Sequence, residues 1–251
     1  MKLSTFAIAA VLAAVATAAS AADLSPKMVT KAPPAPPVAT WTGFYVGGQV
    51  GWGHAETEAG PFFSTVGPFI AGVPGGTFSG DGIAGGGHIG ANYQFQNNVV
   101  VGVEADINGT NADHSGSFLA LGIPPGLPFT ENNSIDYYGT VRARLGIASG
   151  QWLVYGTGGW AWTRMNSTIT SPGQLAGPFT TSNTQTLDGW VAGVGINYMY
   201  TPNWIVGVEY KHLDFGSATY TYIFPFAGGT PVTASNSLTI DEVTLRASYK
   251  F

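Results

Sequence analysis

Apolar and polar residues alternate along much of the chain, and the alternation is clearest in its last nine residues. From Val243 to Phe251 every odd position is apolar, and the even positions carry Thr, Arg, Ser and Lys. Successive side chains of a strand point to opposite faces, so this segment predicts a strand with one apolar and one polar side. A strand that ends on its apolar side in an aromatic residue is typical of a transmembrane barrel.

The same alternation predicts eight strands, and their residue ranges follow from the sequence alone. We expect them at 42–54, 82–95, 99–111, 135–147, 152–167, 187–200, 204–222 and 237–251. The facing of 152–167 stays ambiguous, because this segment is rich in Gly and Trp. Eight strands predict a small barrel whose interior is filled mainly by side chains.

The connections between these strands alternate in length. Tight turns are expected at 96–98, 148–151 and 201–203, and long polar stretches rich in Gly and Pro at about 55–80, 112–134, 168–186 and 223–236. Outer-membrane barrels place short turns in the periplasm and long loops outside. The predicted fold is therefore all-β, a single eight-stranded antiparallel up-and-down transmembrane barrel whose first and last strands begin and end on the periplasmic side.

Composition agrees with a barrel. Only 9% of the 251 residues are charged, the net charge is −5, and there are 36 glycines and no cysteine. After the N-terminal segment no apolar run approaches the roughly 20 residues of a spanning helix, which leaves a closed barrel. The mild acidity argues against nucleic acid as a partner, and the lack of cysteine excludes disulfides and thiolate metal sites.

The N-terminal segment has the features of a secretory signal peptide. Lys2 precedes an apolar run, and small residues follow it up to Ala22. We expect cleavage after Ala21 or Ala22, with an uncleaved anchor as the alternative. Residues 23–40 are rich in Pro and predict a periplasmic linker, for which a contact with peptidoglycan through Lys27 and Lys31 is a second interpretation. The barrel then occupies 41–251.

Charged residues fall on the polar face near the middle of the predicted strands. An Arg or Lys that faced lipid there would cost several kcal/mol, so we expect these side chains to line the lumen. Buried charges are tolerated when they are paired, which predicts an ion-paired plug; a narrow ion path with the same lining stays open. The residues are Glu104, Asp106, Arg142, Arg144, Glu209, Lys211 and Arg246.

Aromatic residues gather beside the predicted turns and chain ends. Amphipathic rings favour the headgroup level of a bilayer, so they predict an interfacial girdle. Its members are Trp41, Phe44, Tyr93, Phe95, Trp152, Tyr198, Tyr200, Trp204, Tyr249 and Phe251.

Other motifs in the chain have ordinary explanations. The glycine-rich run at 85–90 matches a dinucleotide fingerprint, but no helix is predicted after it. His212 and Asp214 resemble the His–Asp pair of outer-membrane proteases, although rim polar residues explain them as well. His54 and His114 show no metal-ligand spacing and leave a haem-like ligand as an alternative. Solvated loop charge is the default interpretation of Glu56, Glu58, Asp113 and Glu131.

Several segments together resemble the rhizobial-type family of small outer-membrane β-barrels. They are WTGFYVGG at 41–48, GTVRARLG at 139–146, LVYGTGG at 153–159, GWVAGVG at 189–195, VGVEY at 206–210 and the terminal YKF. The resemblance implies an abundant surface antigen in the outer membrane of alphaproteobacteria that supports envelope integrity. Some members are called porin-like and some bind haem, and no catalytic residues come with the family.

The sequence thus predicts a structural outer-membrane barrel that displays surface loops. It predicts no enzyme, no cofactor and no metal, and it leaves a narrow porin or a surface ligand receptor as alternatives. The expected partners are outer-membrane lipid, lipopolysaccharide and the barrel-assembly machinery. Tyr249 and Phe251 resemble the C-terminal signal that this machinery reads.

Overall fold

The computed structural model describes residues 40–60, 63–64, 76–111, 114–120, 127–172, 178–224 and 230–251. The predicted signal peptide and all but the last residue of the predicted linker lie outside the described residues. Within these ranges no helix is long and apolar enough to cross a membrane.

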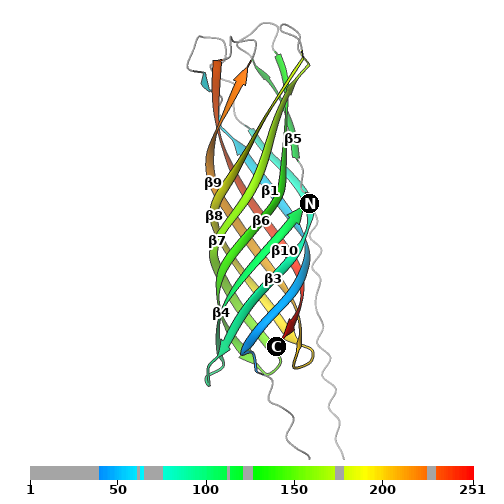
Figure 1. Cartoon of the computed structure of the whole chain (residues 1–251), viewed down its shortest axis with the longest axis vertical. Coiled ribbons are helices and arrows are strands. Elements are labelled where there is room, and N and C mark those ends of the chain that lie inside the picture. Colours follow the sequence, from blue (N-terminus) through cyan, green and yellow to red (C-terminus); the bar gives the residue numbers. More distant parts are fainter. Residues whose placement is uncertain are drawn as a thin grey trace, which may run out of the picture. The chain divides into compact units, whose positions relative to one another are not determined.

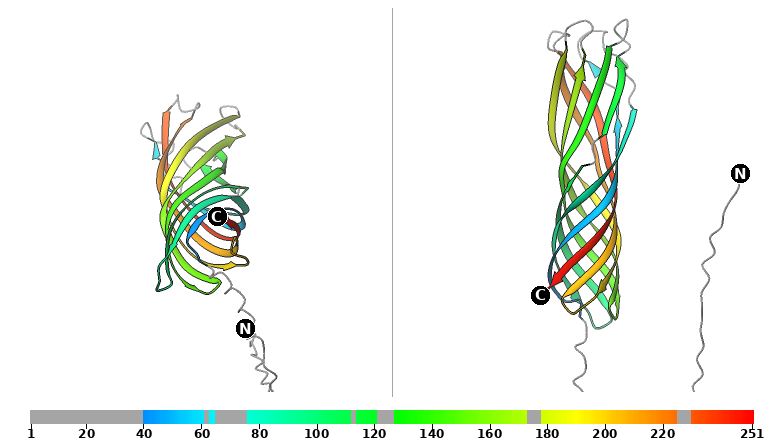
Figure 2. Two further views of the ribbon diagram at one scale, coloured as in Figure 1. Left: turned by 60° about the horizontal axis from the view of Figure 1, so that its bottom comes forward. Right: turned by 90° about the vertical axis from the view of Figure 1, so that its right-hand side faces the viewer.

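Eight long antiparallel strands form a closed ring (Figures 1 and 2). Each strand pairs with its neighbour in the ring, and β1 pairs with β10 to close it, which confirms the predicted architecture. Two short strands lie outside the ring path: β2 (Phe63–Ser64) pairs with β10, and β5 (His114–Ala120) pairs with β6. The ring strands are β1 (Gly43–Ala59), β3 (Gly76–Gln94), β4 (Val99–Thr110), β6 (Leu127–Ser149), β7 (Trp152–Ser171), β8 (Phe179–Met199), β9 (Trp204–Phe224) and β10 (Thr230–Lys250).

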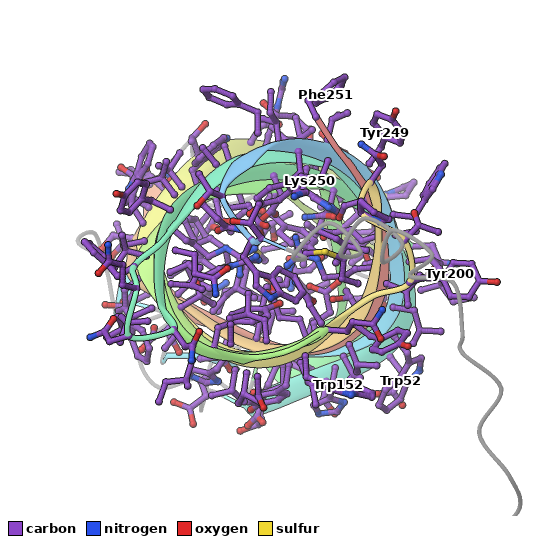
Figure 3. The ribbon with its side chains drawn as sticks, turned by 90° about the horizontal axis from the view of Figure 1, so that it is seen from below. Trp52, Trp152, Tyr200, Tyr249, Lys250 and Phe251 are labelled. Carbon is purple, nitrogen blue, oxygen red and sulfur yellow. The ribbon has the colours of Figure 1, made fainter. Side chains whose placement is uncertain are left out.

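The barrel wall sorts side chains by the predicted parity. In β1, Phe44 and Val46 are exposed on the outer face, whereas Tyr45 and Gln49 are buried in the lumen. The structure also resolves the facing of β7, where Leu153 is buried and Trp152 is exposed. Figure 3 shows the same sorting at the end of β10, where Lys250 points inward and Tyr249 and Phe251 point outward.

The predicted girdle needs one correction. Tyr93, Trp152, Trp204 and Tyr249 are exposed on the outer face near the tight turns, as expected. Trp41 has no exposed surface and packs inside the barrel instead. Trp41 has the same odd parity as Tyr45 and Gln49, so the alternation of β1, continued to this residue, turns its ring inward, where the lumen end is apolar.

The strands run further than the sequence predicts at the end opposite the tight turns, which we call the loop end. Segments expected to be loops belong to strands there, including the first residues of β6, β8 and β10. Beyond the apolar band the outer face is polar too, so Thr, Ser and Asn occupy both faces and the alternation of hydrophobicity fades. These residues still suit strands, since Thr favours extended structure.

At the loop end the ring divides into two sheets. The ladder between β8 and β9 stops at Trp190 and Asp214, and the ladder between β3 and β4 stops at Ala84 and Thr110. Beyond these points β5, β6, β7 and β8 form one sheet, and β9, β10, β1 and β3 form the other. Register shifts in β6 near Ile135 and between β9 and β10 near Ser237 accompany the change, as bulges do at barrel rims.

Candidate functional site: the layered lumen

An apolar layer closes the lumen at the end with the tight turns. It consists of Trp41, Val100, Ala148, Leu153, Tyr155, Met199 and Ile205. The backbone nitrogen of Trp41 donates to Gln94 Oε1 at 2.9 Å, and Lys250 Nζ donates to the carbonyl oxygen of Thr40 at 2.5 Å. The residues just before β1 are therefore held inside the barrel mouth.

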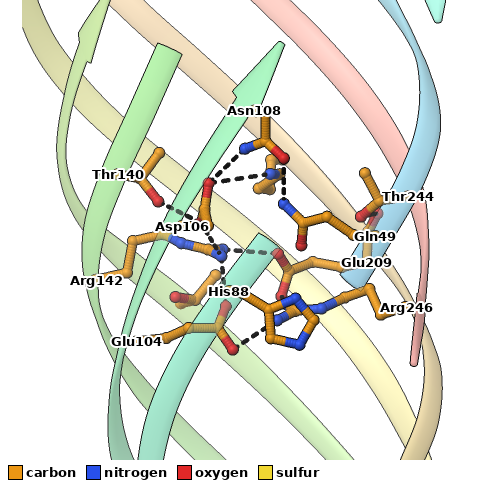
Figure 4. A network of polar contacts seen from close by, with 12 residues as sticks. Gln49, His88, Glu104, Asp106, Asn108, Thr140, Arg142, Glu209, Thr244 and Arg246 are labelled. Carbon is orange, nitrogen blue, oxygen red and sulfur yellow. Dashed lines mark hydrogen bonds and ion pairs between the residues drawn. The ribbon is translucent and has the colours of Figure 1, made fainter. Parts of the chain in front are cut away.

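Arg142 lies at the centre of the lumen and contacts three carboxylates (Figure 4). Its two terminal nitrogens lie 2.6 Å from Glu104, 2.8 Å from Asp106 and 2.7 Å from Glu209. These carboxylates come from β4 and from β9, on different sides of the ring. Charge-assisted bonds of this length are the stronger kind, so Arg142 links strands across the lumen.

Two further arginines extend this network toward the tight turns. Arg246 lies 2.6 Å from Glu104 and 2.5 Å from Glu209, and Arg144 lies 2.7 Å from Glu104. The phenol hydroxyls of Tyr45 and Tyr155 donate to Glu104 and Glu209 at 2.7 and 2.6 Å. Each glutamate thus has several donors, which a buried carboxylate requires.

Glu242 completes the charge balance and is absent from the predicted network. Lys211 Nζ lies 3.2 Å from Glu242, and the Tyr138 hydroxyl donates to it at 2.7 Å. Its even position on β10, in phase with Thr244 and Arg246, was the available signal. Within the described residues the central lumen holds four cations and four carboxylates, all with side chains at most 3% exposed. The structure brings together all seven predicted charges.

Glycines make room for the two tyrosines. A Cβ on Gly90 would clash with the ring and hydroxyl of Tyr45, and a Cβ on Gly195 would clash with those of Tyr155. Glycine at these inward positions therefore lets each phenol cross the lumen to its glutamate. Gly195 pairs directly with Tyr155 across β7 and β8.

A second apolar layer covers the charge network on the loop side. It is made of Ala55, Ala84, Ile135, Tyr138, Ala161, Met165, Leu187, Val191, Leu213, Phe215, Leu238 and Ile240. A cavity of about 10 Å³ lies between this layer and Glu242, which is room for about one water molecule. The central charges are thus enclosed by apolar side chains on both sides.

The histidines considered from the sequence lie elsewhere. His54 Nδ1 lies 2.6 Å from Asp81, and both side chains are exposed. His212 pairs with Asp241 at 2.8 Å rather than with Asp214, and its ring contacts Trp190 on the outer face. The protease-like pair of His212 and Asp214, which the sequence set against ordinary rim polar residues, is therefore not formed. The side chain of His114 lies outside the described residues, as does Asp113.

The predicted loop acids also need correction. Glu131 belongs to β6 and is buried at 1% exposure, because its strand extends through the predicted loop and turns the side chain inward. Glu56 and Glu58 belong to β1, and the glycine-rich run at 85–90 lies within β3. In the described part of the chain no group of three or more His, Cys, Asp or Glu residues is arranged to hold a metal ion.

Comparison with known proteins gives consistent results. A family model described as the outer membrane protein beta-barrel domain matches residues 7–251. The chain is 34% identical over 202 residues to the 31 kDa outer-membrane immunogenic protein of Brucella melitensis, covering 74% of this chain and 76% of that protein. It is 30% identical over 217 residues to the 22 kDa outer membrane protein of Rhizobium leguminosarum, covering 86% and 84%.

Two solved structures share the fold at low sequence identity. The outer membrane protein OprG of Pseudomonas aeruginosa aligns with a TM-score of 0.50 and 12% identity, over 84% of this chain and 96% of that one. The outer membrane protease OmpT of Escherichia coli aligns with a TM-score of 0.51 and 11% identity, over 84% and 98%. At this identity the similarity concerns the fold alone.

Proposed function

Because this chain belongs to the outer membrane protein β-barrel domain family and resides in the outer membrane, we propose that it is a closed structural barrel. In this role the ion-paired lumen is a permanent plug, and the barrel supports the envelope and carries surface loops. In this role the barrel neither passes solutes nor catalyses a reaction.

The position of Arg142 is the observation that carries the proposal. Its guanidinium is fully buried and bound to Glu104, Asp106 and Glu209. An ion that crossed the lumen would have to separate these pairs, and an uncompensated buried charge costs several kcal/mol. The apolar layers on both sides of the network support the same conclusion, since an ion in transit would lose its hydration there.

The test is the conductance of the full-length chain in planar bilayers. We expect no stable, reproducible open channels from refolded protein. Regular single-channel steps of uniform size would contradict the plug and favour the narrow porin.

A substitution tests whether the network holds the barrel together. Arg142→Met should lower the free energy of unfolding by about 3–5 kcal/mol, because it leaves four buried carboxylates with only three cations. Arg164→Met is the matched control: its guanidinium is exposed and lies 3.9 Å from Asp136, so we expect a change of about 0–1 kcal/mol. Urea unfolding followed by tryptophan fluorescence measures both. If the two variants are equally stable, the network does not hold the barrel together.

A further inference from the structure

The two sheets of the loop end enclose a polar layer beyond the second apolar layer. Glu131 and Asn133 from β6 and Ser167 from β7 face Asn236 from β10. The side chains of all four are at most 3% exposed. The layer therefore joins one sheet to the other at the level where their backbone ladders have separated.

Glu131 is the charged member of this layer. Its Oε1 accepts from Ser167 Oγ at 3.0 Å and from Asn236 Nδ2 at 3.4 Å, and the amide of Asn133 also bonds the carboxyl group. The bonding groups found among the described residues, those of Ser167, Asn133 and Asn236, are all neutral. Within the described residues Glu131 forms no ion pair, whereas each of the four carboxylates of the central lumen forms at least one.

Three oxygen atoms in the layer have no hydrogen-bond partner among the described residues. They are Glu131 Oε2, Asn133 Oδ1 and Asn236 Oδ1. Buried polar atoms without partners are rare and costly. All three atoms are acceptors, so a group that satisfied them would have to supply positive charge or protons.

Glu131 lies beyond the lipid-facing band, which on this side of the barrel ends near Tyr137 and Trp160. Burial raises the pKa of its carboxyl group, and the bonds from Ser167, Asn133 and Asn236 oppose this change only in part. The ionised carboxylate is therefore at a disadvantage as long as no cation accompanies it.

We propose that Glu131, Asn133 and Asn236 form a binding site for a hard cation such as Ca²⁺. Carboxylate and amide oxygens are the ligands that Ca²⁺ prefers. Rotation of either amide by 180° exchanges Nδ2 and Oδ1 and turns an oxygen toward the carboxylate. The bound cation then connects β6 with β10 and fastens the two sheets. With one charged ligand, we expect the modest affinity of extracellular sites, about 10⁻⁴–10⁻³ M.

Calcium titration of the full-length chain refolded in detergent tests the site. In the wild type, Ca²⁺ should raise the thermal midpoint by several degrees, and EDTA should reverse the rise. Glu131→Gln should weaken Ca²⁺ binding at least about tenfold, since ligand charge sets affinity. Asp136→Asn is the control: it removes an exposed carboxylate from the outer face of the same strand and should change nothing.

Terbium luminescence gives a second readout that does not depend on stability. Tb³⁺ is a probe for Ca²⁺ sites. Tyr220 is buried beside the layer: it pairs with Ala234, two residues before Asn236 on β10, and its hydroxyl donates to Met165 Sδ, two residues before Ser167 on β7. We expect Tyr220-sensitised emission that Ca²⁺ displaces and that Tyr220→Phe removes while Ca²⁺ stabilisation remains. Emission that persists in Tyr220→Phe would overturn the proposal, because the ion would then lie beside another ring.

Two further outcomes would overturn it. If Glu131→Gln binds Ca²⁺ as tightly as the wild type, the rise of the thermal midpoint comes from Ca²⁺ bound to exposed acidic residues. A wild type that ignores about 10 mM Ca²⁺, well above the affinity range expected for such sites, would mean that a proton rather than a cation neutralises Glu131. If Glu131→Gln does not refold, the comparison of wild type with Tyr220→Phe decides.

Discussion

At the scale of single residues, the inward or outward direction of a side chain follows from its parity within a strand. This rule placed the charges of Arg142 and Glu209 in the lumen. Applied to the last strand, the same rule also turns Glu242 toward the lumen. It also holds for Trp41, which shares the odd parity of Tyr45 and fills the lumen end, although its place beside the first strand suggested the girdle. Parity gives the direction of a side chain, whereas its partners depend on which strands stand opposite.

Gly195 offers a prediction at this scale. Gly195→Val would push Tyr155 away from Glu209, because a Cβ there clashes with the tyrosine ring. We expect a loss of about 1–3 kcal/mol, the usual cost of overpacking, measured by urea unfolding. Gly156→Val is the control, since a Cβ at this outward glycine meets only the carbonyl of Gly193 at 3.9 Å. Equal effects of both substitutions would show that strand propensity, rather than the tyrosine contact, explains the loss.

At the scale of elements, the strands were predicted well where one face meets lipid. In β4 apolar residues such as Val103 alternate with charged residues such as Glu104. The predicted strand 99–111 therefore nearly equals the observed strand Val99–Thr110. In β8 the residues before Leu187 are Thr, Ser, Asn and Gln on both faces, so this part was predicted as a loop although the strand begins at Phe179. Pairing with β7 makes it a strand.

The separation of β8 from β9 gives a prediction for these elements. Beyond Trp190 the backbone ladder is replaced by side-chain amides: Asn183 donates to the carbonyl of Thr221 and Gln185 to that of Thr219. Replacing both by Ala should speed hydrogen exchange in the outer part of β9 by about fivefold or more, since each bond contributes about 1 kcal/mol. Mass spectrometry of the exchanged peptides measures the change, and faster exchange throughout β9 would contradict a local role.

At the scale of the whole barrel, ring closure and charge balance depend on each other. The ring brings β4 and β9 to opposite sides of one lumen, so that Arg142 from β6 reaches carboxylates of both. The predicted seven charges left one cation in excess, and Glu242 removes this excess. A barrel this narrow requires such neutrality, because its interior is filled by side chains rather than by water.

The enclosure of these pairs predicts how the barrel responds to salt. Buried ion pairs are screened far less than exposed ones. We therefore expect the thermal midpoint to change by only about 2–3 °C between about 0.05 M and about 1 M NaCl, over which the Debye length falls severalfold. Calorimetry or the gel shift of heated samples measures it. A steady fall of the midpoint with salt would show that the network is open to ions.

The role in envelope integrity, the contacts with lipopolysaccharide and the assembly machinery, and the signal carried by Tyr249 and Phe251 stay predictions, as do the signal peptide and the linker. Both aromatic side chains, Tyr249 on β10 and Phe251 just after it, point outward. It is compatible with an assembly signal and equally with a membrane girdle.

The sequence by itself determined the barrel, the number of its ring strands and, except in β7, the face to which the lipid-level side chains point. It could do so because lipid on one side and a polar lumen on the other impose a two-residue period that is visible in the chain. Only the tertiary structure decided which charges meet and that Glu131 is buried between two sheets. These facts depend on which strands stand opposite each other across the ring, and a period along one strand carries no information about the opposite wall.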